Sequence, residues 1–204
     1  MSRTSYVPSG AKIKVIGLGG AGCNAITRMV REQIRGVEFI AMNTDAQHLS
    51  ITEVALRLQL GERATRGLGA GGDPIQGRKA AEESRDDIKQ AVFGADMVFV
   101  TAGMGGGSGT GSIPMVAEVA KQSGALTIAV VTKPFAFEGL HRNRTADEGI
   151  MDLIEKVDTL VIIPNDRLLE LCDQKTAVDS AFTLADECLH HGVQAIAEVV
   201  TVPG

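Results

Sequence analysis

Short apolar runs alternate with longer amphipathic stretches along most of the chain. Runs that are short and rich in β-branched residues, as buried strands are, occupy residues 13–17, 37–42, 97–100, 125–132 and 160–163. Apolar residues recur at helical spacing over 75–91, from about 137 to 156, and over 177–200. Since strands and helices alternate with short connections, the sequence predicts an α/β fold with a doubly wound, mainly parallel sheet and helices on both faces.

A glycine-rich loop, residues 101–112, follows the apolar run 97–100 and precedes a helical pattern. Glycines without Cβ let backbone N–H groups approach an anion, and a helix N-terminus favours negative charge. Ser108, Thr110 and Ser112 are expected to donate hydroxyl hydrogen bonds to the same anion. The pattern predicts a phosphate site at this strand end, and a flexible surface loop is the alternative.

Two further glycine clusters also follow or precede predicted elements. In the first, Gly17, Gly19 and Gly22 satisfy G-x-G-x-x-G between a strand and a helix, which is a weak dinucleotide-binding signal by itself. The second covers residues 66–74. Asn43 and Asp45 end the second predicted strand, where they would contact ribose hydroxyls or a phosphate-bound metal, or form only an Asx turn.

Charged residues later in the chain allow both structural and functional interpretations. Glu138 and Arg142 lie four apart, which fits a surface pair on a helix as well as a ligand contact. Asp186 lies among apolar neighbours of the last predicted helix, where an unpaired carboxylate is unfavourable. A bound ligand would supply its partner, and a solvent-facing position would remove the need for one.

Composition excludes several classes of function. A net charge of −5 argues against broad nucleic-acid binding. Cys23, Cys172 and Cys188 lack metal-ligand spacing and indicate free thiols in a reducing compartment. The adjacent pair His190 and His191 is expected at the surface, with its rings pointing in different directions. No secretory signal or membrane span is evident, so the sequence favours a cytoplasmic protein.

The kind of nucleotide is suggested by what the main glycine loop lacks. A Walker loop places a lysine directly after its last glycine, whereas here the first lysine after Gly111 is Lys121. Backbone N–H groups, hydroxyls and Mg²⁺ must therefore neutralise the phosphates. Three glycine clusters suggest a longer phosphate chain than a pyrophosphate, which favours a nucleoside triphosphate over NAD.

Taken together, these residues resemble the tubulin/FtsZ superfamily, and within it the FtsZ family of bacterial cell-division GTPases. The matching motifs occur in order at residues 17–24, 43–45, 67–72, 105–111, 132–135, Glu138 with Arg142, and 165–166, and the similarity extends from residue 12 to residue 204. The resemblance implies a flexible tail over 1–10, a GTP-binding domain over 11–176, and a long central helix with its exit over 177–204.

The resemblance also implies an activity. Members bind GTP or GDP with Mg²⁺ held through the phosphates rather than by protein side chains. They polymerise head to tail into the filaments of the division ring and hydrolyse GTP where subunits meet. The expected location is cytoplasmic, at the division site, with a membrane link through adaptor proteins and no nucleic-acid partner.

The family's site carries over residue by residue. Gly20 to Asn24 and Gly105 to Gly111 would cradle the phosphates, Ala70, Gly71 and Gly72 would sense the γ-phosphate, Asn165 and Asp186 would read the guanine edge, and Phe182 would stack on the ring. The full set of expected GTP contacts is Gly19, Gly20, Ala21, Gly22, Cys23, Asn24, Asn43, Asp45, Ala70, Gly71, Gly72, Gly103, Gly105, Gly106, Gly107, Ser108, Gly109, Thr110, Gly111, Thr132, Pro134, Glu138, Arg142, Asn165, Phe182 and Asp186.

The sequence departs from the family at two points. Ser108 stands where the family usually has threonine, which keeps the hydroxyl. The sequence ends at Gly204, before the family's synergy loop, whose acidic residues reach into the next subunit's site, and before its second domain. The expectation is therefore a chain that binds nucleotide, holds no catalytic residue of its own and hydrolyses GTP poorly alone. An NAD-dependent Rossmann oxidoreductase and a GTP-binding scaffold without turnover are the alternatives.

Overall fold

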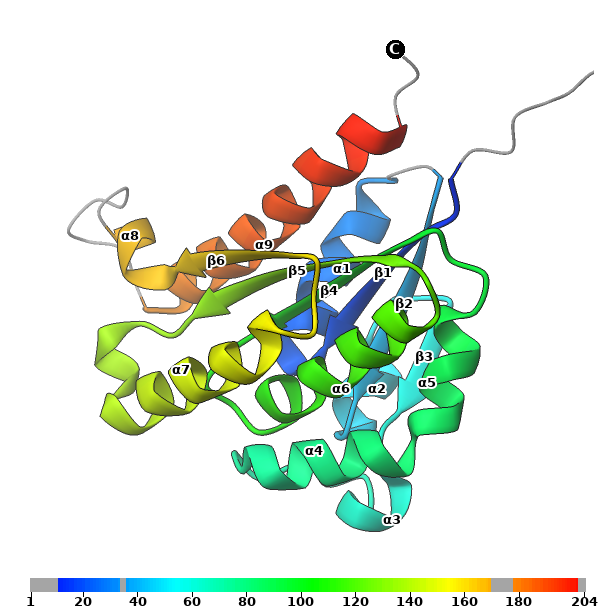
Figure 1. Cartoon of the computed structure of the whole chain (residues 1–204). Helices are drawn as coiled ribbons and strands as arrows, with labels where there is room; N and C mark the ends of the chain where they lie inside the picture. Colours follow the sequence, from blue (N-terminus) through cyan, green and yellow to red (C-terminus); the bar gives the residue numbers. More distant parts are fainter. Residues whose placement is uncertain (1–10, 34–35, 170–177, 202–204) are drawn as a thin grey trace, which may run out of the picture.

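A single sheet of parallel strands forms the centre of the computed structural model, which describes residues 11–33, 36–169 and 178–201, with residues 178, 179 and 196–201 described by their backbone only (Figure 1). Six strands lie in this described part, in the order β3-β2-β1-β4-β5-β6. They are β1 (Ile13–Leu18), β2 (Val37–Asn43), β3 (Leu56–Gln59), β4 (Met97–Gly103), β5 (Leu126–Lys133) and β6 (Thr159–Pro164). Every neighbouring pair is parallel, so the predicted fold class is confirmed.

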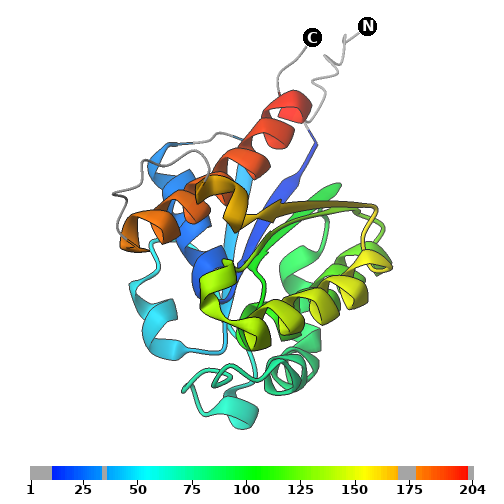
Figure 2. The ribbon, with the colours of Figure 1, turned by 90° about the vertical axis from the view of Figure 1, so that its left-hand side faces the viewer.

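Helices cover both faces of the sheet, as the two views in Figures 1 and 2 show. The helices are α1 (Gly19–Arg31), α2 (Ala46–Ile51), α3 (Glu62–Thr65), α4 (Pro74–Glu83), α5 (Arg85–Val92), α6 (Ser108–Gln122), the 3-10 turn η1 (Ala136–Glu138), α7 (Leu140–Ile154), α8 (Asn165–Leu169) and α9 (Val178–Thr201). One face packs against α4, α5, α6 and α7, and the other packs against α1, α2 and α9. No helix of the described residues is long and apolar enough to cross a membrane.

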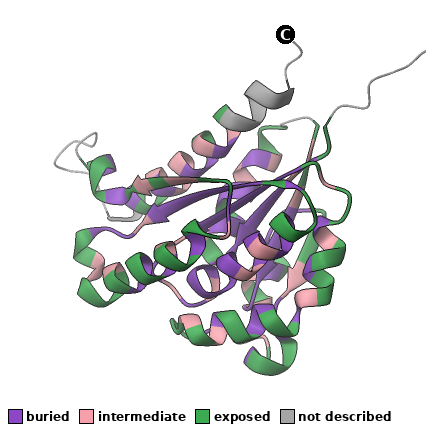
Figure 3. Cartoon of the chain, viewed as in Figure 1, coloured by how far each residue is buried: buried purple, intermediate pink, exposed green. Residues whose placement is uncertain are grey.

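The sheet separates two apolar cores, which Figure 3 shows as a buried band along the strands. Alternate side chains of one strand enter opposite cores, since Val98 and Val100 of β4 face α6 whereas Phe99 faces α1 and α9. From β1 near the middle of the sheet, the chain adds β2 and β3 toward one edge. It then returns to place β4 on the other side of β1. This reversal of strand order is where open parallel sheets place their ligands, at the carboxyl ends of the strands.

Close packing of α4 on the start of α6 depends on two glycines. A Cβ on Gly77 would come 2.2 Å from the carbonyl oxygen of Gly107, and one on Gly111 would come 2.1 Å from that of Pro74. Backbone atoms cannot give way as the end of a side chain can. Gly111 therefore serves helix packing, and it faces α4 rather than a ligand.

Gly77→Ala is expected to destabilise the protein by about 1 to 3 kcal/mol through overpacking, although alanine is the better helix former by about 1 kcal/mol. Urea unfolding would measure the difference. Gly192→Ala in α9 is the matched control, because its Cβ would meet only the side-chain atoms Val130 Cγ1 at 3.1 Å and Ile163 Cδ1 at 3.5 Å. Equal stability of the Gly77 variant and the parent would contradict the role assigned to this contact.

Three features differ from the sequence predictions. The helix predicted over 75–91 is two helices, α4 and α5, which meet at Ser84, and the hydroxyl of Ser84 accepts a hydrogen bond from the Gly61 N–H (2.9 Å). The helix predicted to begin near 137 is preceded by η1 and begins at Leu140. The short elements α2, β3 and α3 were not predicted. Helices α2 and α3, of 6 and 4 residues, are too short for a periodic pattern, whereas β3 was missed although Leu56, Leu58 and Leu60 alternate with polar residues.

The prediction of a surface histidine pair was wrong for His190. Its side chain is 1% exposed because α9 packs on α1, and its Nε2 lies 3.0 Å from Glu32 Oε2. The rings of His190 and His191 are in contact, with centroids 4.8 Å apart. Cys23 and Cys188 are free thiols, as expected, while Cys172 and the predicted tail over 1–10 lie outside the described residues.

Candidate nucleotide site

Two helix N-termini converge at the carboxyl ends of β1 and β4. Helix α1 begins at Gly19 directly after β1, and α6 begins at Ser108 after the glycine loop. The two starts touch, because a Cβ on Gly19 would lie only 2.9 Å from the backbone nitrogen of Gly109. Neither helix has an acidic residue in its first turn or a side chain that caps its N-terminus. Their free N–H groups and positive dipole ends therefore make this point favourable for an anion.

A cavity of about 290 Å³ opens from these helix starts. Its lining includes many of the expected contacts: Gly19, Gly20, Ala21, Gly103, Gly106, Gly107, Ser108, Gly109, Thr132, Pro134, Glu138, Arg142, Asn165, Phe182 and Asp186. The residues come from the ends of β1, β4, β5 and β6 and from α9, which places segments far apart in sequence around one space. Two of the three glycine clusters, those near residues 19 and 106, and the later polar residues thus border a single cavity.

The three hydroxyls expected to bind one anion have separate roles. Ser108 lines the cavity, and its Oγ lies 2.5 Å from the Thr44 hydroxyl. Thr110 is buried, and its Oγ1 accepts a hydrogen bond from the Gly105 N–H (2.8 Å). Ser112 is buried one turn further on and donates to the Ser108 carbonyl oxygen (2.6 Å). Ser112 thus donates its hydroxyl hydrogen within the chain, whereas the Thr110 hydroxyl, which accepts from Gly105, keeps its own hydrogen to donate. Both hydroxyls fix the loop, and their contact with a shared anion stays a prediction.

At the other end of the cavity, an amide and a carboxylate are poorly satisfied. Asn165 at the start of α8 is 5% exposed, and no donor of the described residues reaches its Oδ1. Asp186 on α9 accepts from Asn24 Nδ2 at 3.4 Å, which is long for a hydrogen bond. Buried polar groups of this kind cost free energy unless a partner is supplied. Both groups border the cavity, so a ligand there can supply one.

Burial also changes the acidity of Asp186. It raises the pKa of this carboxyl from 3.8 to about 6, although Asn24 and the nearby charge of Arg28 favour the ionised form. Arg28 is not free to neutralise it, because its guanidinium binds Glu187 at 2.8 Å. A ligand that offers hydrogen-bond donors to Asp186 would stabilise the carboxylate.

An apolar wall lies beside these polar groups. Phe182 is 40% exposed and borders the cavity, with its ring held edge-on against Phe135 and Phe137 at centroid distances of 5.5 and 6.1 Å. Phe135 and Phe137 themselves stack at 4.8 Å. A partly exposed aromatic ring that is fixed by two others provides a firm surface for a planar ligand.

Glu138 and Arg142 form an ion pair at the rim of the cavity. Glu138 is held from its other oxygen, which accepts the backbone N–H of Phe135 at 2.9 Å. Its side chain is only 9% exposed whereas that of Arg142 is 53% exposed. Because Glu138 belongs to η1, the pair spans the join between η1 and α7 rather than one continuous helix.

Several expected contacts lie outside the lining of the cavity. Asn43 and Asp45 are used locally: Asp45 caps α2 by accepting the His48 N–H at 3.0 Å, and Asn43 Oδ1 lies 3.3 Å from the Asp45 nitrogen. Because the Asp45 N–H donates to the Oδ1 of Asn43 two residues earlier, the Asx turn is formed by Asn43, whereas Asp45 is the N-cap of α2. The other residues outside the lining are Gly22, Cys23, Asn24, Ala70, Gly71, Gly72, Gly105, Thr110 and Gly111.

Several of the residues outside the lining pack against the segments that form it. A Cβ on Gly22 would come 2.4 Å from the Thr101 carbonyl oxygen, so this glycine packs α1 on β4. Cys23 is fully buried, and burial raises the pKa of its thiol to about 12, which leaves it unreactive. Ala70 and Gly72 lie against the loop, since a Cβ on Gly107 would come 2.9 Å from each of them.

The sequence missed three lining residues, Leu18, Met104 and Ala185. Leu18 and Met104 directly adjoin glycines that were identified, and Ala185 precedes Asp186. Being apolar, they carry no chemical signal of their own. Only their position next to recognised motifs could have indicated them.

Comparisons with known proteins agree with this geometry. Residues 12–173 match the model of the tubulin/FtsZ family, GTPase domain. The structure resembles that of an empty FtsZ dimer from M. jannaschii with a TM-score of 0.93 and 49% sequence identity, covering 96% of this chain and 57% of that one. The chain thus spans less than two thirds of this relative's length.

More distant structures share the fold. A GDP-bound monomer of CetZ1 from Haloferax volcanii has a TM-score of 0.79 at 24% identity, covering 95% of this chain and 65% of that one. A GTPγS-bound protofilament of CetZ2 from Haloferax volcanii has the same score and identity, covering 91% and 57%. The sheet, the paired helix starts and the family match lead to one conclusion: the chain belongs to the tubulin/FtsZ family and carries residues of its GTPase domain.

Proposed function

We propose that this chain binds GTP and GDP in the cavity between α1, α6 and α9. The observation that carries the proposal is the pairing of two unlike ends in one cavity. One end offers uncapped helix N-termini and the other offers Asn165, Phe182 and Asp186. An anionic chain attached to a planar, hydrogen-bonding base matches both ends at once.

The different chemistry of the two ends of the cavity favours one orientation of the nucleotide. The phosphates lie against the starts of α1 and α6, where Gly106, Gly107 and Gly109 expose backbone N–H groups. The ribose lies near Glu138 and Arg142. The guanine stacks on Phe182, and its ring N–H and amino group donate to the Asp186 carboxylate, which adenine cannot imitate.

Mg²⁺ fits this arrangement through the phosphates. No three metal-ligating side chains gather among the described residues. The carboxylates that line the cavity, Glu138 and Asp186, are an ion-paired group at the rim and a group at the base end. The ion would thus be held by phosphate oxygens and water, with the Ser108 hydroxyl nearby, and would neutralise phosphate charge.

Hydrolysis of GTP needs a group that can position or activate the attacking water, in addition to the residues named so far. The phosphate end of the described lining consists of glycines, Ala21 and Ser108, none of which is a base at neutral pH. We therefore propose that GTP hydrolysis, and with it head-to-tail assembly, involves a neighbouring copy of the protein. A role in the division ring, a cytoplasmic site of action and a membrane link through adaptors extend this proposal. The FtsZ dimer and the CetZ2 protofilament among the similar structures support self-association.

The NAD-dependent alternative is weaker on structural grounds. A dinucleotide site uses an acidic residue after the second strand to bind the ribose. Here that position is Asp45, which caps α2 and does not line the cavity. Titration of nucleotide-free protein with GTP, GDP, ATP and NAD would test the choice. We expect GTP and GDP to bind at least tenfold more tightly than the others, and equal or tighter NAD binding would overturn the proposal.

Guanine binding should depend on pH through Asp186. Its pKa of about 6 in the free protein means that about half of the carboxyl groups are protonated at pH 6, and that most are ionised only from about pH 7 upward. Because the base donates two hydrogen bonds to the ionised form, affinity for GDP should fall by about tenfold per pH unit below 6. Calorimetric titration between pH 5 and 8 would show this. An unchanged affinity at pH 5 would contradict the assignment of Asp186 to the base.

A further inference from the structure

Helix α7 touches the first turn of α6 at Gly149. A Cβ added to Gly149 would lie 2.3 Å from Thr110 Cγ2 and 2.9 Å from Met104 Cε. Ordinary carbon contacts are about 3.5 to 4 Å. The absent side chain therefore allows α7 to rest directly on Thr110, two residues after the start of α6.

Thr110 in turn sets the shape of the glycine loop. Its hydroxyl accepts the Gly105 N–H at 2.8 Å, and Gly105 has a φ of +100°, a conformation open to glycine only. A β-branched residue carries its hydroxyl and methyl on the same carbon. Rotation of χ1 to move Cγ2 away from an alanine at position 149 would consequently remove the hydroxyl from Gly105.

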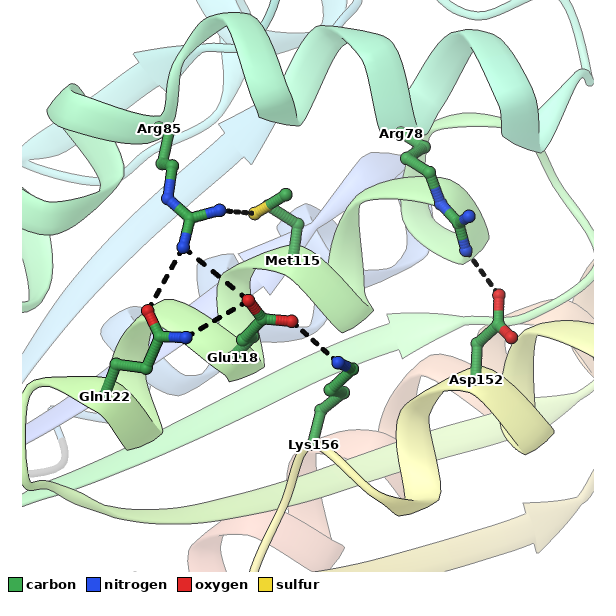
Figure 4. A network of polar contacts seen from close by, with 7 residues as sticks. All are labelled: Arg78, Arg85, Met115, Glu118, Gln122, Asp152 and Lys156. Carbon is green, nitrogen blue, oxygen red and sulfur yellow. Dashed lines mark hydrogen bonds and ion pairs between the residues drawn. The ribbon is translucent and has the colours of Figure 1, made fainter.

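Core packing opposes a shift of α7 away from this contact, because Ala146 and Leu153 of the same helix are fully buried in the core that it shares with α6. Two ion pairs, drawn in Figure 4, tie its C-terminal half to the neighbouring helices: Asp152 binds Arg78 of α4, and Lys156, just after α7, binds Glu118 of α6 at 2.7 Å. Glu118 also faces Arg85, 3.6 Å away. Lys156 holds the pKa of Glu118 below its ordinary value.

We infer that Gly149 is a positioning residue for the phosphate loop, acting through Thr110 on Gly105. The inference rests on the proposed binding of nucleotide phosphates at this loop. Gly149 does not line the nucleotide cavity, and it borders, with Thr110, a separate cavity beside α4. Its contribution is to leave space for the one Thr110 rotamer that holds Gly105 in place.

Gly149→Ala should weaken GDP binding by about ten- to hundredfold, because the loop loses its hydrogen bond and presents misplaced N–H groups to the phosphates. The double variant Gly149→Ala/Thr110→Ser tests whether Gly149 acts on the loop through Thr110. Serine keeps the hydroxyl for Gly105 and lacks the Cγ2 methyl that the alanine would strike. We expect the double variant to regain most of the affinity for GDP that Gly149→Ala loses. A general packing defect would not give this recovery.

Glu148→Ala is the matched control, since this neighbouring side chain is 67% exposed and pairs with Arg144 on the same helix. Affinities would be measured by titration with GDP, and folding by thermal unfolding. Parent protein that fails to bind guanine nucleotides would refute the proposed function itself. Parent binding with undiminished affinity in Gly149→Ala, or a double variant as weak as the single one, would refute only the positioning role.

Discussion

Asp186→Ala is expected to abolish the preference for guanine over adenine nucleotides while leaving phosphate binding partly intact. Two hydrogen bonds to a carboxylate are lost, and each is worth about 1.5 to 3 kcal/mol. Affinity for GTP should accordingly fall by about a hundredfold or more. Affinity for ATP should change little, because adenine has no N–H pair to offer this acceptor. Competition titrations with GTP and ATP would measure both.

The same substitution should not unfold the protein. Burial disfavours the charged form of Asp186, so its removal at neutral pH takes away an unfavourable group. Glu148→Ala is the control here too, because this carboxylate lies on α7, pairs with Arg144 and does not line the cavity. Equal losses of GTP and ATP affinity in Asp186→Ala would show that Asp186 does not read the base.

Gly106→Ala should separate nucleotide binding from folding at the phosphate end. A Cβ on Gly106 would meet nothing within 4 Å, and its backbone has no left-handed φ, so the free protein accepts alanine without strain. Gly106 nevertheless lines the cavity, and the methyl group would occupy space needed by a phosphate. We expect unchanged thermal stability together with about a thirtyfold or greater loss of affinity for both GTP and ATP.

Gly124→Ala provides the opposite control. Gly124 also has open space around it, but its φ is +89° and it follows α6 at the far end from the cavity. Alanine there should cost about 1 kcal/mol of stability without changing affinity. Normal nucleotide binding by Gly106→Ala would mean that the phosphates lie elsewhere.

Local patterns explain why much of the fold could be predicted. The strands are apolar runs, and the glycine clusters follow or precede elements in an order that only a few folds share. The parallel sheet and the gathering of Ser108, Glu138, Asn165 and Asp186 at one edge followed from that order. The family resemblance added what spacing could not supply, which is the identity of the base.

The remaining features depend on contacts distant in sequence. At the junction of α4 and α5, the Ser84 hydroxyl binds the N–H of Gly61, which is 23 residues away. The Thr110 hydroxyl accepts the Gly105 N–H because the loop brings Gly105 back to the start of α6. Burial of His190 depends on the packing of α9 on α1. None of these contacts can be predicted from the type of a single residue or from the periodicity of apolar residues in a short segment.

Identification of the nucleotide that the purified chain carries tests the central claim most directly. The protein would be denatured, and the released small molecules separated by ion-exchange chromatography against GDP, GTP, ATP and NAD standards. An empty preparation would be loaded with an equal mixture of the four, washed and analysed in the same way. We expect GDP or GTP in close to one copy per chain, and recovery of NAD or ATP in their place would contradict a guanine site built from these residues.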